Sequence, residues 1–133
     1  MEHSVSIKST QNDTVLEFSK HVGHHYEVCV RGPSFHAGTR VYDSEPAGLE
    51  GFFRDLAANR TGWFGSKEWA SAEGEVSITA SSDSTGHATL AVHLISGPYC
   101  FDWDLTTALL VPLAQLGTVA SEMKVFLTGT GAT

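Results

Sequence analysis

The segment spanning residues 48–69 constrains the fold more than any other part of the chain. Its apolar residues recur at the period of an α-helix with one buried face, at Leu49, Phe52, Phe53 and Leu56. Ser44 is a suitable N-cap residue, and Gly62 suits a helix end. The sequence therefore predicts an amphipathic helix, which must cover an apolar surface formed by other parts of the chain.

An aromatic turn follows this helix, in the order Gly62-Trp63-Phe64-Gly65. Two glycines around two large rings predict a tight turn whose backbone lies close to aromatic faces. We expect Trp63 to be largely buried over the helix stripe, and residues 66–68 to form a short polar linker to Trp69. Two interpretations stay open at this point. The aromatic residues either cover a sheet core or form the wall of a pocket for a ligand or partner.

Alternating apolar residues predict strands on both sides of the helix, and residues 21–25 are expected to form a loop. A second amphipathic helix is expected after Pro112. Connections of hairpin length predict antiparallel pairing, so we expect an α+β fold in which one antiparallel sheet of about six to seven strands carries two helices on one face. The expected strands cover residues 5–7, 14–20, 26–31, 35–42, 75–80, 87–95 and 99–105, the last extending to 109–111.

Length and composition predict a single domain over residues 1–133, with residues 128–133 as a flexible tail. The chain is 41% apolar and 17% charged, which is sufficient for an ordinary core. The N-terminus lacks the basic and apolar regions of a signal peptide, and no apolar run reaches the roughly 18 residues of a membrane span. We therefore expect a cytoplasmic protein that does not enter a membrane.

The net charge of −7 argues against nucleic-acid binding through a basic surface. It is compatible with a protein partner, although a solvated acidic surface is the simpler interpretation. Cys29 and Cys100 lie in expected strands, where we interpret them as buried thiols and not as a disulfide. Their spacing excludes a zinc ribbon.

One polar cluster could carry chemistry. Asp102 and Asp104 flank Trp103 and are expected on one face of a strand, about 7 Å apart, with His93 on a neighbouring strand. Such a group could act as a general acid and base, whereas a water-exposed sheet face is the alternative. The histidines at 21, 24 and 25 are expected in a solvated loop and not at a metal. The chain has no nucleophile elbow, phosphate loop, dinucleotide fingerprint or zinc-protease motif, so we expect no catalytic residue, cofactor or metal.

The chain resembles a family of small, mostly actinobacterial proteins known only as domain of unknown function 6228. The resemblance covers most of the chain, and its motifs are structural. It implies no activity, cofactor or catalytic residue. The matching residues are Leu49-x-x-Phe52-Phe53-x-x-Leu56-Ala57, Gly62-Trp63-x-Gly65, Trp69, Ser71, Glu73-Gly74, Gly86-His87 and Leu116.

Two functions follow as expectations. The first is a small acidic interaction module that binds a partner protein, by analogy with bacterial toxin-immunity proteins. The second is a small-molecule-binding protein or small enzyme, with a pocket between the sheet and the 63–69 segment. The residues expected to bind a ligand or partner are Trp63, Trp69, His93, Asp102, Trp103 and Asp104.

Overall fold

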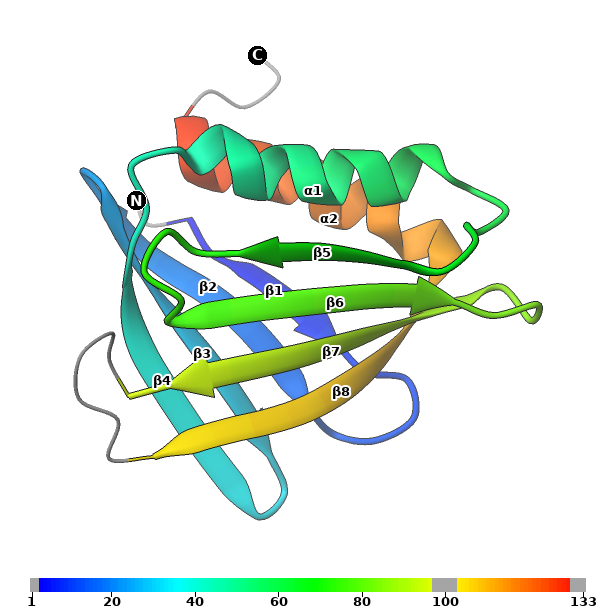
Figure 1. Ribbon diagram of the computed structural model, residues 1–133, viewed down its shortest axis with the longest axis horizontal. Helices are drawn as coiled ribbons and strands as arrows, with labels where there is room; N and C mark the ends of the chain where they lie inside the picture. Colours follow the sequence, from blue (N-terminus) through cyan, green and yellow to red (C-terminus); the bar gives the residue numbers. More distant parts are fainter. Residues whose placement is uncertain (1–2, 97–102, 130–133) are drawn as a thin grey trace.

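The computed structural model describes residues 3–96 and 103–129 (Figure 1). Within these residues four strands and a helix are followed by four further strands, a short 3-10 helix and a second helix. The order of four strands and a helix thus occurs twice, and the α+β class is confirmed. The elements are β1 (Val5–Lys8), β2 (Val15–Val22), β3 (His25–Gly32), β4 (Phe35–Tyr42), α1 (Pro46–Ala58), β5 (Ser66–Ala70), β6 (Val76–Ser82), β7 (His87–Ile95), β8 (Asp104–Pro112), η1 (Leu113–Gln115) and α2 (Leu116–Thr128).

The strands form two antiparallel four-stranded sheets, so the prediction of one sheet of six to seven strands was wrong. We call them sheet A, in the order β1-β2-β3-β4, and sheet B, in the order β5-β6-β7-β8. Within each sheet short connections make successive strands neighbours. Between β4 and β5, however, the chain passes through α1, so these strands do not pair.

Two local predictions were also wrong. The expected polar linker is strand β5, whose residues are only exposed or half-buried because it lies at an edge of sheet B. Its sequence therefore lacks the fully buried positions by which a strand is recognised. The expected loop at 21–25 is a tight hairpin, in which β2 continues to Val22 and Gly23 takes a φ of +61°. The first four residues of the expected strand 99–105 lie outside the described residues.

Alternate positions of both sheets point inward, and the predicted helix stripe is buried against them. The two helices pack against each other, with α1 next to β5 and α2 next to β1 and β2 (Figure 1). An aromatic cluster lies where α2 and α1 meet sheet A. Phe18 is its centre, 6.1–6.5 Å between ring centroids from Tyr26, Phe53 and Phe126.

Buried hydrogen bonds connect sheet A to the turn between β5 and β6. The carboxylate of Glu75, which is only 2% exposed, accepts from the backbone N–H of Tyr42 at 3.0 Å and from the Ser71 hydroxyl at 2.7 Å. Nearby, the Tyr26 hydroxyl donates to Asp43 at 2.9 Å. Burial, with the neighbouring carboxylate of Asp43, raises the pKa of Tyr26 far above its usual range, so this hydroxyl remains a donor. Among the described residues no buried side-chain nitrogen or oxygen lacks a hydrogen-bond partner.

The Tyr26 hydroxyl should therefore contribute to stability. We predict that Tyr26→Phe costs about 1–3 kcal/mol of unfolding free energy, because a buried carboxylate oxygen loses its donor. Tyr42→Phe is the matched control, since within the described residues the Tyr42 hydroxyl has no hydrogen bond and the substitution keeps the ring beside His24 and His25. Urea unfolding followed by circular dichroism measures both variants. Equal losses for the two would show that the Tyr26–Asp43 bond contributes nothing specific.

Candidate functional site

The residues predicted from the sequence to form a site lie in two separate places on sheet B. Trp63 precedes β5 and Trp69 lies in it, whereas His93 is in β7 and Trp103 and Asp104 are at the start of β8. Because β5 is two strand spacings from β7 and three from β8, Trp69 is separated by about 10 Å from the strand of His93 and by about 14 Å from the strand of Asp104. Asp102 lies outside the described residues. The structure therefore does not gather the named residues into one pocket.

The group at β7 and β8 forms an exposed ion pair beside a shallow hollow. The Nε2 atom of His93 lies 3.9 Å from Oδ2 of Asp104, whose side chain is 69% exposed. Trp103 is 37% exposed. Trp103 and Asp104 line one side of a hollow of about 390 Å³, and His36 and Gly38 of β4 line the other side. An exposed pair of this kind contributes little energy.

The structure places a thiol beside an imidazole on the outer face of sheet A, a pair that the sequence analysis missed. Nε2 of His36 lies 2.9 Å from Sγ of Cys29. The β3–β4 hairpin pairs Cys29 with Gly38, so His36 is its diagonal neighbour on the same face. The register of this hairpin was the sequence signal from which the Cys29–His36 pair could have been predicted. Burial raises the pKa of the Cys29 thiol, while the neighbouring Arg31 acts in the opposite direction and does not cancel the effect.

Trp63 anchors the turn between α1 and β5, and its ring, which was predicted to be largely buried, is partly buried and packs against the hydrophobic core. Its indole N–H donates to the carbonyl of Ala80 at 3.1 Å. Its backbone N–H donates to the Ser82 hydroxyl at 2.9 Å, and that hydroxyl donates to the Trp63 carbonyl at 3.1 Å. The side chain thus ties the turn to β6 and packs against the core.

Phe64 is held fully exposed at the tip of this turn. Gly62 and Gly65 flank the Trp63-Phe64 pair with φ values of +99° and +75°, which side chains rarely permit. A Cβ atom on Gly62 would also lie only 2.7 Å from the Ser82 Oγ atom. Glycine is therefore favoured on both sides of the Trp63-Phe64 pair, and the Phe64 ring is left in solvent.

Trp69 borders a different hollow, between the start of α1 and β5. The hollow has a volume of about 320 Å³ and includes Asp43, Glu45 and Gly48 among its lining residues. A Cβ atom on Gly48 would lie 3.7 Å from Nε1 of Trp69, so the indole ring is close to the helix. An aromatic face with two carboxylates is suited to a small cation.

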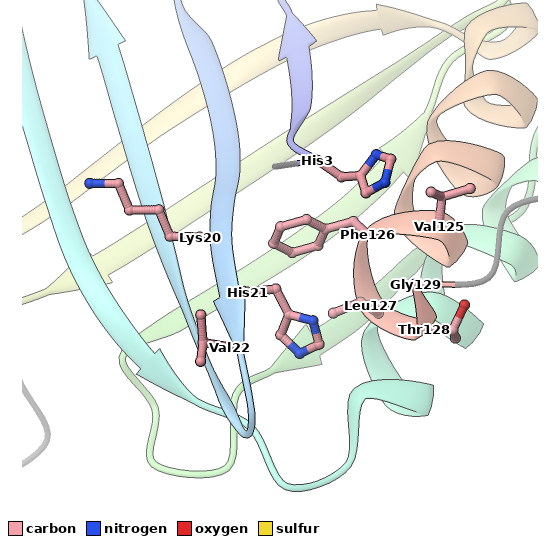
Figure 2. Close-up of a pocket in the computed structure, with 9 residues that line it drawn as sticks. All are labelled: His3, Lys20, His21, Val22, Val125, Phe126, Leu127, Thr128 and Gly129. Carbon is pink, nitrogen blue, oxygen red and sulfur yellow. The ribbon is translucent and has the colours of Figure 1, made fainter. Parts of the chain in front are cut away.

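A cavity of about 330 Å³ lies where the end of β2 meets the end of α2. Figure 2 shows His3 and His21 on either side of the Phe126 ring, whereas the Lys20 side chain extends away from them. Lys20 has a φ of +56° at an irregularity in the β2–β3 pairing, and it forms an ion pair with Glu27 at 3.7 Å. The ring of His21 packs 5.5 Å from that of Phe126, so it serves to attach α2 to sheet A.

The described residues contain no group of three or more His, Cys, Asp or Glu side chains that could hold a metal ion. None of the helices in that part of the chain has the length and apolar character required to cross a membrane. The arrangement provides an exposed aromatic anchor, several shallow hollows and one thiol–imidazole pair. Of these, only the Trp63–Phe64 turn combines an exposed ring with a constrained backbone.

Comparison with known proteins gives a match over almost the whole chain. The sequence model described as "Family of unknown function (DUF6228)" matches residues 4–130. No curated protein matches the chain. No solved structure matches it.

The raised pKa of Cys29 predicts a slow thiol. We expect the pH at which iodoacetamide alkylation reaches half its maximal rate to be higher in folded protein than in the same protein unfolded in urea, because burial disfavours the thiolate. The measurement uses a Cys100→Ser background, so that only Cys29 reacts. A midpoint at or below the unfolded value would instead indicate that His36 activates the thiol.

Proposed function

The chain belongs to the DUF6228 family, and we propose that it is an interaction module that binds a partner protein through the surface around Phe64. The observation that carries this proposal is the fully exposed Phe64 ring on a turn that Trp63 ties to β6. Large aromatic side chains at interfaces often supply most of the binding energy.

The constrained turn favours binding for an energetic reason. A side chain that is already held in place loses little conformational freedom when a partner covers it. The hydrogen bonds of Trp63 to Ser82 and Ala80 limit the motion of the turn before any partner arrives. Phe64 is therefore better suited to act as an anchor than an exposed ring on a long loop.

The immunity-type form of this proposal, a cytoplasmic protein that neutralises its partner, is supported by the small size and the net charge of −7. A strongly charged surface accelerates encounter with a partner of opposite charge. This support is an analogy of size and charge.

We expect Phe64 to be in direct contact with the partner. Replacing Phe64 by the photocrosslinker benzoylphenylalanine should yield one discrete cross-linked protein in cells of the source organism. The same photocrosslinker in place of Val22, an aliphatic residue that is also highly exposed, is the matched control. With the captured partner purified, Phe64→Ala should weaken binding by about 2 kcal/mol or more, as expected of an interface anchor. Cross-links of equal yield from both positions, or none from position 64, would contradict the proposal.

A second candidate, small-molecule binding, is favoured by the hollow beside Trp69. Its volume of about 320 Å³ is at the lower end of ligand pockets, and Asp43 and Glu45 favour a cation. We expect tetramethylammonium to change the tryptophan fluorescence of the wild-type protein, and the neutral tert-butanol of similar size to leave it unchanged. Trp69→Phe should abolish the response. A response that survives this substitution would place the ligand elsewhere.

A further inference from the structure

A groove lies between the second half of α1 and the start of α2, on the side where Figure 1 shows these two segments next to each other. Its volume is about 570 Å³, and its floor consists of small and apolar residues. Arg54 and Arg60 are the charged residues that line it. The floor is formed by Ala57, Ala58, Leu113, Ala114 and Gly117.

The two arginines differ from their surroundings in charge. Residues 43–133 contain eleven of the fifteen acidic residues of the chain but only four of its eight basic residues, and Arg54 and Arg60 are two of these four. Among the described residues Arg60 forms no salt bridge. Arg54 is 73% exposed and pairs only with Glu50, one helical turn away, at 3.2 Å. The Glu50 side chain in this pair is only 13% exposed, so Arg54 has to stay with it, and Arg60 is the guanidinium that can bind a new carboxylate.

The groove lies close to the turn that presents Phe64. A Cβ atom on Gly62 would lie 2.7 Å from Ser82 and 4.0 Å from Cδ1 of Leu113, and Leu113 is part of the groove floor. A partner that contacts Phe64 therefore has the groove within reach.

We propose that this groove receives an acidic, apolar segment of the partner protein. An aliphatic side chain of that segment packs on the alanine and leucine floor, and a carboxylate of the segment pairs with Arg60. Guanidinium groups bind carboxylates with two parallel hydrogen bonds, which makes them selective for this group. This inference rests on the proposed function, because it names the chemistry of the one segment of the partner that enters the groove. The net charge of −7 favours a partner that is basic over the rest of its contact surface.

Charge complementarity also argues against a second copy of the chain as the occupant. In a two-fold dimer centred on this surface, each groove would face the same patch of the other copy, with its own Arg54 and Arg60. Like charges opposed across an interface are unfavourable. An acidic segment meets no such repulsion.

The test uses isotope-labelled protein and two short peptides. Acetyl-Leu-Glu-Leu-Glu-amide should shift the amide NMR signals of Ala57, Ala58, Ala114 and Gly117, and the charge-reversed acetyl-Leu-Lys-Leu-Lys-amide should not. Arg60→Glu should weaken binding of the acidic peptide at least about tenfold, the factor that corresponds to 1.4 kcal/mol. Groove signals that stay unchanged, or that shift equally with both peptides, would overturn the proposal.

A matched pair of substitutions on α2 separates the groove from general charge. Gly117→Glu places a carboxylate in the groove, where an added Cβ meets no atom within 4 Å, and should abolish peptide binding. Thr118→Glu makes a glutamate at the next position, which is exposed and does not line the groove, and should leave binding unchanged. Equal loss with both variants would overturn the proposal.

The two proposals fail in different experiments. The peptide titration needs no partner, so groove signals that do not respond contradict only the acidic segment, even when Phe64 cross-links to a partner. Conversely, a missing Phe64 cross-link contradicts the interaction module itself. If sedimentation shows that the wild-type protein self-associates and Arg60→Glu prevents this, the occupant is a second copy and the proposed acidic segment is wrong.

Discussion

The relative position of the two sheets and of the α1–β5 side of the molecule depends on the hydrogen bonds that the buried carboxylate of Glu75 accepts. One oxygen accepts from the last residue of β4, Tyr42, and the other accepts from Ser71 in the turn that begins β6. The carbonyl of Glu75 also accepts from the backbone N–H of Ile95 at the end of β7. A buried carboxylate that lost these donors would carry a large desolvation cost. Sheet A, the β5–β6 turn and β7 are therefore kept in one relative position.

This arrangement determines where α1 can lie, and α1 in turn determines the surface around Phe64. The helix begins shortly after Asp43, the residue that accepts the hydrogen bond from Tyr26, and it packs on α2 and β5. At its other end the chain must return to β5 within a few residues, through a turn that only glycine permits at Gly62 and Gly65. Trp63 is used to attach this turn to β6, and Phe64 is left in solvent as a consequence.

The same geometry gives the molecule two chemically different sides. The surface near α1 carries an aromatic anchor and, beside it, an apolar groove with two arginines. The outer faces of the sheets carry an exposed His93–Asp104 pair and the Cys29–His36 pair, neither of which lies in a deep cavity. Binding of a protein segment needs a wide surface with an anchor, whereas catalysis needs enclosed polar groups. The first requirement is met here more fully than the second, which is why we favour an interaction module.

The sequence by itself determined the features that depend on neighbours a few residues away. The apolar stripe of α1, the inward faces of most strands and the α+β class follow from local periodicity, and the structure confirms them. Tertiary structure alone decided that the strands divide into two sheets, because α1 carries the chain away from β4 before β5 begins. It also decided that Trp63 is half-buried. The groove that Arg54, Arg60 and Gly117 line forms only when α1 packs on α2, so the sequence did not reveal it. Periodicity records whether a side chain is buried, but it carries no information about which distant segment buries it.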